Sequence, residues 1–301
     1  MFRKSLAGRG SFLITLLLIA GSIPGSAQST QGNAQPGKGS GTSQLTAELV
    51  RTGLFLISGG GSNSLLRLSA NGLILVDGKL PGNYAAIVAL ANKISFSEQP
   101  IRIVINTAHY EDRSGNNAKF IEAGAQILAH ENVRLNLSPY KPAGARIAPP
   151  TKTYDHDLPV RLGGIEVQLM HFGNARTSGD TVVYFPNLKV VAVGDLYTAE
   201  TPHPDFSAGG SLVGWGPVLA EILKLDFDVV VPSAGPMVAR ADLERLKGKL
   251  DSFVSRAAAL AKKGVPKGQL LAQLNREEPE WHLNLMGEPL DRFYTEVSRR
   301  K

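Results

Sequence analysis

Residues 106–117 read Asn106-Thr107-Ala108-His109-Tyr110-Glu111-Asp112-Arg113-Ser114-Gly115-Asn116-Asn117, and this stretch decides the fold. It follows a short, continuous apolar run, residues 101–105, which is typical of a buried β-strand. The candidate functional side chains of this stretch therefore sit on a loop that leaves a buried strand. They are His109, Tyr110, Asp112 and Arg113.

Apolar patterns on the N-terminal side of this loop, and just after it, alternate between strands and helices. Short apolar runs at 54–57 and 65–68 flank Gly59-Gly60-Gly61, which predicts paired strands joined by a turn. Asn71-Gly72 predicts a tight hairpin turn into a strand over 73–77. Helical spacing predicts a helix over 84–94, and 117–124 and 125–129 follow as a helix and a strand. This order of elements indicates a layered α/β domain.

The second half of the chain continues the pattern after a loop rich in Pro, Gly and Ala at 139–150. A helix is predicted at 215–224, and strands are predicted at 165–170, 181–185, 190–193 and 229–232. From Ala241 to the end the pattern is helical, with one interruption at Gly264-Val265-Pro266. We find no internal repeat of solenoid length.

The 106–117 loop resembles the signature loop of the metallo-β-lactamase superfamily, whose usual pattern is Asn-Thr-His-x-His-x-Asp-His-x-Gly-Gly-Asn. Leu75-Val76-Asp77 matches an early strand of that family. Three later segments resemble family motifs in the right order: Gly173-Asn174-Ala175-Arg176-Thr177-Ser178-Gly179-Asp180-Thr181, Gly194-Asp195-Leu196 and Pro232-Ser233-Ala234-Gly235-Pro236. The resemblance implies an α/β fold, a four-layer αββα sandwich, over residues 45–245. The helical pattern beyond it predicts a C-terminal extension, residues 246–301.

The same resemblance implies a set of metal ligands that this chain lacks. In the family, three histidines bind one zinc ion, an aspartate and two histidines bind a second metal, and the Gly-Asp-Leu aspartate bridges the two. Asp112 and Asp195 occupy the two aspartate positions. The five histidine positions hold Ala108, Tyr110, Arg113, Arg176 and Ala234. The chain is therefore identified as a degenerate member that lacks the metal-binding histidines.

These replacements disfavour a metal. A protein zinc site needs about three or four lone-pair donors, usually imidazole, thiolate or carboxylate. Alanine offers none, and a guanidinium stays protonated and repels a divalent cation. We therefore expect no metal and no other cofactor, and without zinc-bound hydroxide we expect no hydrolysis of the family type.

The two arginines suggest a substitution of charge. Without metals, Asp112 and Asp195 would face each other with like charge. Because a guanidinium can bind a carboxylate through two hydrogen bonds, we predict that Arg113 and Arg176 pair with Asp195 and Asp112 in the former metal pocket. The alternative is that both arginines extend into solvent. A pocket of this kind would accept a small anionic or polar ligand, and its residues are His109, Tyr110, Asp112, Arg113, Arg176 and Asp195, with His203 nearby.

A hydrolase remains the second hypothesis. His109 and His171, together with Asp112 and Asp195, could form a shifted metal site, although His109 in extended backbone would face away from the pocket. Metal-free acid–base chemistry by Tyr110, His109 and Asp112 is another route to cleavage of an ester, lactam or similar bond. The chain contains no Gly-x-Ser-x-Gly nucleophile motif.

The N-terminus has the order of a secretory signal. Arg3, Lys4 and Arg9 precede an apolar run at 12–20 and the small residues Gly25-Ser26-Ala27. The run is shorter than the roughly 20 apolar residues that span a bilayer. We predict a signal peptide at 1–27, a flexible linker at 28–44 and no membrane span after cleavage; an uncleaved anchor is the alternative. Export to the periplasm or secretion suits a chain without cysteine.

Composition limits the partners. Among 301 residues, 43% are hydrophobic and 19% charged, as in a globular protein. The net charge of +6 falls to +3 when the three basic residues of the signal are removed, and no segment is densely basic, so no nucleic-acid partner is predicted. Trp281, Phe293 and Tyr294 predict C-terminal helices that dock on the domain or on a second subunit. We predict a non-catalytic binding or interaction protein that binds a small ligand, a protein partner or a second copy.

Overall fold

Sheet A contains the first half of the chain. The computed structural model describes residues 44–142, 146–277, 281 and 283–300. β1 to β4 pair antiparallel and β4 to β7 pair parallel, in the order in which they occur along the chain. The strands are β1 (Thr46–Arg51), β2 (Leu54–Ser58), β3 (Ser64–Ser69), β4 (Gly72–Val76), β5 (Ile101–Ile105), β6 (Gln126–His130) and β7 (Lys152–Tyr154).

Parallel strands require crossover connections, and short helices supply them in sheet A. α1 (Tyr84–Ser95) connects β4 to β5, and α4 (Glu131–Leu137) connects β6 to β7. Between β5 and β6 lie α2 (Glu111–Ser114) and α3 (Asn117–Glu122). α2 is formed by the loop that decided the fold in the sequence, so that loop leaves the carboxyl end of a central parallel strand.

Sheet B contains the second half of the chain and has the order β13-β12-β11-β10-β9-β8. β11 and β12 are parallel, while all other neighbours are antiparallel. The strands are β8 (Asp157–Leu162), β9 (Ile165–Met170), β10 (Val182–Phe185), β11 (Val190–Gly194), β12 (Val229–Pro232) and β13 (Val238–Ala239). α5 (Leu212–Ile222) makes the crossover from β11 to β12.

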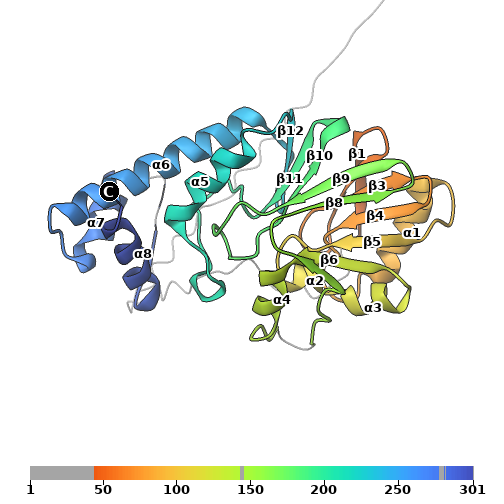
Figure 1. Ribbon diagram of the computed structural model, residues 1–301, viewed down its shortest axis with the longest axis horizontal. Helices are drawn as coiled ribbons and strands as arrows, with labels where there is room; N and C mark the ends of the chain where they lie inside the picture. The colour runs from red at the N-terminus through yellow and green to blue at the C-terminus, as the bar shows by residue number, and fades with distance from the viewer. Residues whose placement is uncertain (1–43, 143–145, 278–280, 282, 301) are drawn as a thin grey trace, which may run out of the picture. The chain divides into compact units, whose positions relative to one another are not determined.

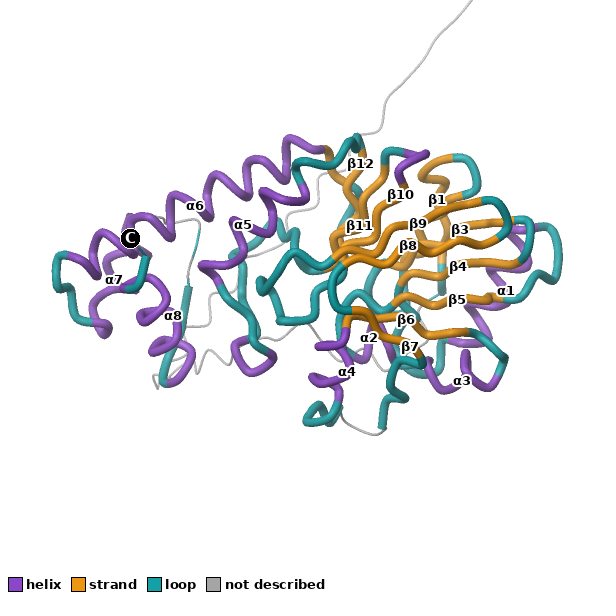
Figure 2. Tube along the Cα trace, viewed as in Figure 1, coloured by secondary structure: helices purple, strands orange, loops and turns teal. Residues whose placement is uncertain are grey.

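Three hydrophobic cores define the layers. The first lies between the sheets, where Leu56 and Ile105 of sheet A and Val183 of sheet B are buried in one cluster. The second fills the space between sheet A and α1 and α3, and it contains Ile87 and Phe120. Figure 1 shows these helices against sheet A, and Figure 2 shows the strands of both sheets in orange between the flanking helices. The expected αββα sandwich is confirmed.

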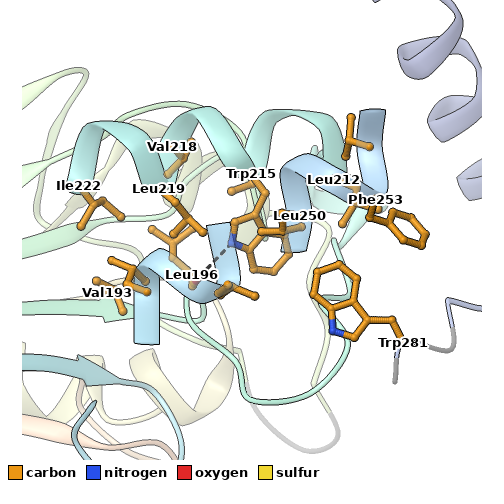
Figure 3. Close-up of a cluster of buried hydrophobic side chains, with 14 of the residues drawn as sticks. Val193, Leu196, Leu212, Trp215, Val218, Leu219, Ile222, Leu250, Phe253 and Trp281 are labelled. Carbon is orange, nitrogen blue, oxygen red and sulfur yellow. Dashed lines mark hydrogen bonds between the residues drawn. The ribbon is translucent and has the colours of Figure 1, made fainter. Parts of the chain in front are cut away.

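The third core lies on the outer face of sheet B and includes the C-terminal helices. These helices are α6 (Arg240–Lys262), α7 (Lys267–Glu277) and α8 (Glu288–Ser298). Trp215 of α5 is buried at its centre and donates its indole N–H to the carbonyl of Leu196, 2.9 Å away. Figure 3 shows Leu250 next to this side chain, and Phe253 and Trp281 near each other in the same cluster, so the extension shares a core with sheet B.

Most predicted elements match the structure, and the differences have local causes. Four strands were not predicted: β1 and β8 are mostly accessible strands without an apolar run, and β7 and β13 have three and two residues. The short helices α2 and α4 were not predicted either. α5 begins at Leu212, before the predicted start, because Ser211 accepts a hydrogen bond from Gly214 N and caps the helix. The expected boundary between residues 245 and 246 falls inside α6, which continues without interruption from Arg240.

The predicted signal peptide and nearly all of the predicted linker lie outside the described residues. Within the part of the chain that the structure describes, no helix combines the length and apolarity that crossing a membrane requires.

Candidate functional site

The candidate site lies where four strand ends of the two sheets meet. Asp77 follows β4, the 106–117 loop follows β5, Asp195 follows β11 and Ser233 follows β12. Each of these strands belongs to a parallel pair, β4 with β5 and β11 with β12. Ligand sites in open α/β sheets form outside the carboxyl ends of such strands. The topology therefore places the sequence-predicted residues at the expected edge.

Three asparagines hold the backbone of this edge. Asn106 donates to the carbonyl of Arg113 (3.0 Å) and accepts from Asn117 (2.8 Å). Asn116 donates to the carbonyls of Gly78 (2.7 Å) and Leu80 (2.8 Å). All three asparagines are buried. Asn106 and Asn117 match positions that the family pattern keeps as asparagine, whereas Asn116 stands at a glycine position; all three amides hold the loop in place.

Arg113 is the centre of the site. Its side chain is 4% exposed, and Nη1 lies 2.5 Å from Asp112 Oδ2 while Nη2 lies 2.5 Å from Asp195 Oδ1. Nε lies 3.8 Å from Asp77 Oδ2. Burial by itself would lower the pKa of Arg113, but the charges of Asp195, Asp112 and Asp77 outweigh it and raise that pKa. The prediction divided the two aspartates between Arg113 and Arg176, and in the structure Arg113 pairs with both.

Asp195 is held by more than the ion pair. Ser233 Oγ donates a hydrogen bond to the same oxygen, Oδ1, that Arg113 contacts. Burial favours the neutral acid, but Arg113 and the hydroxyl of Ser233 together lower the pKa of Asp195 below its usual value. Asp195 is therefore an ionised acceptor fixed by two donors, one from each sheet edge.

Asp77 and Lys79 are further charged residues near Arg113, Asp112 and Asp195, and the five side chains form a charged cluster. Asp77 accepts from the backbone N–H (2.8 Å) and the hydroxyl (2.7 Å) of Thr107, and burial raises its pKa to about 7. Lys79 is fully buried; its ammonium donates to the carbonyls of Ile57 (2.7 Å) and Ser62, and burial lowers its pKa to about 8. The cluster thus holds the cations Arg113 and Lys79 and three carboxyl groups.

The glycine-rich turn between β2 and β3 packs against this cluster. Gly61 has a φ of +116°, and a Cβ at this position would lie 3.0 Å from the Cβ of Asp112. Ser62 donates its hydroxyl to the carbonyl of Asp112, 2.6 Å away. The turn predicted from Gly59-Gly60-Gly61 therefore also closes one side of the site.

Arg176 does not make the predicted ion pair. Its Nη1 donates to the carbonyl of His203, and its guanidinium carbon lies 5.4 Å from the ring centroid of Tyr110. Among the described residues no carboxylate lies within ion-pairing distance of it. The carbonyl of Arg176 accepts from the N–H of Asp205 (2.7 Å), so the backbone of Arg176 lies beside the 203–210 segment, where its guanidinium finds the carbonyl of His203.

Tyr110 points toward that same segment. Its hydroxyl donates to Asp205 Oδ2 at 2.9 Å, and burial raises the pKa of the phenol above its usual value. Ser207 and the N–H of Ala208 also donate to Asp205. Asp205 was not predicted as a site residue, since no motif surrounds it in the sequence and its role depends on a contact with a residue 95 positions away.

His109 is buried between two tyrosine rings. Its ring centroid lies 4.2 Å from that of Tyr110 and 5.1 Å from that of Tyr140. Nδ1 is buried and has no hydrogen-bond partner in the described structure. Burial lowers the pKa of His109 to about 4, so the imidazole is neutral at physiological pH.

His171 belongs to a different cluster. Its ring stacks on that of His130 with centroids 3.8 Å apart, and its Nδ1 lies 2.9 Å from the carbonyl of Asp180. Across the described residues, no three His, Asp or Glu side chains are arranged to hold a metal ion. The contacts of His171 thus leave the predicted shifted metal site without this ligand.

The donor set of this site does not fit the zinc ions of the resembled family. A guanidinium occupies the space between the two aspartates, and both of its terminal nitrogens are bonded to them. Ala108 is buried and Ala234 is exposed, and neither offers a lone pair. The arrangement fixes the charged groups of Arg113, Asp112 and Asp195 by mutual ion pairs. Tyr110 and Arg176 lie on the side of the site that faces the 203–210 segment.

α8 reaches back to that segment. Arg292 donates to the carbonyl of Phe206, and its guanidinium carbon lies 5.6 Å from the Phe206 ring centroid. Ser211 donates to Glu296 at 2.7 Å. The C-terminal extension therefore supports the segment that presents Asp205 to Tyr110.

Comparison with known proteins supports the fold. The family model described as the metallo-beta-lactamase superfamily matches residues 57–234. A curated relative, the 2,4-dinitroanisole O-demethylase subunit alpha of a Nocardioides species, is 29% identical over 204 residues. That alignment covers 66% of this chain and 60% of the relative, so the match spans less than two thirds of the relative's length.

Solved structures show the same fold. A metallo-beta-lactamase from Pontibacter korlensis superposes with a TM-score of 0.62 at 19% identity, over 69% of this chain and 99% of that one. The metallo-beta-lactamase FIM-1 from Pseudomonas aeruginosa, in its mono-zinc form, gives a TM-score of 0.59 at 20% identity, over 70% and 96% of the two chains. At 19–20% sequence identity, this similarity shows that the fold is shared.

Proposed function

The chain belongs to the metallo-β-lactamase superfamily, and from this premise we propose that it is a non-catalytic member in which an arginine replaces the metal ions. The observation that supports the proposal best is the position of Arg113. Its buried guanidinium bonds Asp112 and Asp195, the two aspartates at the family's ligand positions. A fixed cation there repels a divalent ion and cannot ionise a water molecule as zinc does.

The charge of the cluster supports the same proposal. Asp77, Asp112 and Asp195 face Arg113 and Lys79, and Asp77 has a pKa of about 7 because it is buried. When Asp77 is protonated, the two cations balance the two remaining carboxylates. A zinc ion added to such a cluster would have to displace Arg113 from both of its partners, at the cost of leaving a buried cation unpaired.

Metal content and turnover test this proposal together. The purified chain, incubated with excess zinc and desalted, is expected to retain far less than one zinc per chain and to cleave neither a generic ester nor a lactam. The matched variant restores histidine at positions 108, 110, 113, 176 and 234 and is expected to retain zinc. Stoichiometric zinc on the parent chain, or turnover that a chelator abolishes, would sink the proposal.

Binding is the role we propose for the protein. The relative is named as a subunit, which supports a protein partner for this chain as well. Both terminal nitrogens of Arg113 are already bonded to Asp112 and Asp195. A small anionic ligand would therefore bind at Arg176, which is half-buried beside Tyr110. Calorimetry with inorganic phosphate is expected to give a signal that Arg176→Gln removes and that the exposed control Arg161→Gln keeps; equal signals in both variants contradict an Arg176 site.

Export is part of the proposal, on the basis of the N-terminal sequence. Expression of the full chain with fractionation is expected to place it in the periplasm or the medium, with a new N-terminus after Ala27. A full-length chain in the cytoplasm contradicts this part alone and leaves the site proposal standing.

The second candidate is a metal-free hydrolase, and one observation favours it. His109 is neutral, and its Nδ1 has no hydrogen-bond partner in the described structure, beside Tyr110 with its hydroxyl on Asp205. Its free nitrogen can accept a proton, and the pKa of about 4 makes it a weaker general base than an ordinary histidine. Turnover that survives chelator and disappears in His109→Phe would establish this candidate in place of the first.

A further inference from the structure

A large aromatic side chain stands out of the surface at the end of α1. Phe96 is 96% exposed and follows the helix as its C-cap in the left-handed region, with a φ of +52°. Glycine is the usual residue in this conformation, because a Cβ costs about 1–2 kcal/mol there. Phe96 therefore carries two unfavourable features, backbone strain and an exposed ring, that no contact within the described fold offsets.

A pocket opens along α1, the helix that Phe96 follows. It has a volume of about 190 Å³ and lies between α1, α3 and the 98–101 segment. Ala91, Ile101 and Phe120 on its lining are buried side chains of the core between sheet A and its helices. Most of its lining is apolar, and its polar lining residues are Asn92, Glu98 and Gln99. An engineered apolar cavity of about 150 Å³ binds benzene, so this pocket has room for one phenyl ring.

The ring and the pocket lie close together because they share a short stretch of chain. Phe96 is two residues from Glu98 on the pocket lining, so their Cα atoms lie at most about 7 Å apart. A two-fold symmetric contact requires that one patch contain both a group and its complement, since residue i then meets j and j meets i. A protruding ring next to a ring-sized apolar pocket meets that requirement.

The charges of this face permit contact between identical copies. The elements that line the pocket have two basic side chains, Lys93 and Lys119, and two acidic ones, Glu98 and Glu122. Lys119 and Glu122 already pair at 2.8 Å. The face therefore has no excess of either sign that would drive two copies apart.

We propose that two copies of this chain associate through this face, each placing Phe96 into the pocket between α1 and α3 of the other. The occupant is a second copy because the chain itself provides both halves of the contact on one patch. The contact buries two aromatic rings at its centre, which is where truncation costs most in protein interfaces.

Sedimentation of the full chain over a range of concentrations tests the proposal. The parent is expected to dimerise, and Phe96→Ser is expected to weaken dimerisation by more than about tenfold, as for an interface hot spot. Since Phe96 is exposed, its loss leaves the fold intact. Met286→Ser, a change of another exposed apolar side chain (75%), is the matched control and is expected to keep the parent affinity.

A second variant and a cross-link separate this contact from any other dimer. Ala123→Trp fills the pocket and is expected to weaken dimerisation as Phe96→Ser does. Because the chain has no cysteine, Phe96→Cys and Ala123→Cys chains can be mixed and oxidised, and they are expected to form a mixed disulfide dimer. A monomeric parent, or a dimer that neither Phe96→Ser nor Ala123→Trp weakens, overturns the proposal.

Discussion

Arg113 and Asp195 are 82 positions apart in the chain, and their side chains meet at 2.5 Å between Nη2 and Oδ1. Arg113 lies in α2, after a strand of sheet A, and Asp195 directly follows a strand of sheet B. The ion pair therefore joins the two sheets at the edge where members of the superfamily hold metal. Its loss should affect both the fold and the charge of the site.

Arg113→Ala is expected to lower the free energy of unfolding by about 3–5 kcal/mol, because it leaves carboxylates buried without their cation. Chemical denaturation at neutral pH measures this. Arg161→Ala, which removes an exposed ion pair with Glu166, is the control and is expected to leave the denaturation midpoint unchanged. Similar midpoints for Arg113→Ala and the parent would mean that the cluster adds nothing to stability.

Lys79→Met tests the second cation of the cluster. The change keeps an unbranched side chain but removes the donor to the carbonyls of Ile57 and Ser62, and we expect a loss of about 2–4 kcal/mol in unfolding free energy. Lys119→Met, at an exposed site paired with Glu122, is the matched control. Equal thermal midpoints for the two variants would contradict the role of Lys79.

The loss of folding stability at acid pH should depend in part on His109. Its folded-state pKa is lowered to about 4 by burial, against about 6.5 when unfolded, so its contribution to stability is full above pH 6.5 and is lost as pH falls toward 4. The contribution lost is up to about 3 kcal/mol.

His109→Phe removes this titration while keeping a ring between Tyr110 and Tyr140. Its unfolding free energy, measured by denaturation at several pH values, is expected to fall less than that of the parent between pH 6.5 and 4. Other acid-sensitive groups, including His130 and His171, are common to both proteins and cancel in the difference. Parallel curves would show that His109 does not titrate in this window.

Arg292→Ala should loosen the segment over the site without changing the site itself. It removes the hydrogen bond to the Phe206 carbonyl and the contact with that ring, together worth about 1–2 kcal/mol. Amide hydrogen exchange over 203–211 is expected to rise about tenfold. Arg276→Ala, a substitution of an exposed residue of α7, is the control. Unchanged exchange over 203–211 in Arg292→Ala would show that α8 does not support this segment.

Sequence patterns were sufficient for the architecture. The order of strands and helices, and the asparagines at 106, 116 and 117, correspond to the observed layers and to a loop that these amides hold. Asn106 bonds a carbonyl of its own loop, whereas Asn116 bonds the carbonyls of Gly78 and Leu80 after another strand, so the partners of Asn116 depend on the fold. The replaced histidine positions were likewise visible in the sequence, because a ligand type depends on residue identity.

Lys79 could have been found by the same reasoning, since it follows a buried strand within three positions, where functional residues of α/β sheets collect. The burial of Lys79 could not have been predicted, because no residue next to it in the sequence requires its ammonium to turn inward to the carbonyls of Ile57 and Ser62.

The sequence by itself determined the superfamily fold, the edge at which the site forms and the residue types that stand there. The tertiary structure decided which of these residues are in contact. Arg113 pairs with both Asp112 and Asp195. Arg176 bonds the carbonyl of His203, and Tyr110 bonds Asp205. The reason is physical. Element types follow from local periodicity. The contacts of Arg113 with Asp195 and of Tyr110 with Asp205 join residues 82 and 95 positions apart, so they depend on how the two sheets pack and on the direction in which each side chain leaves its backbone.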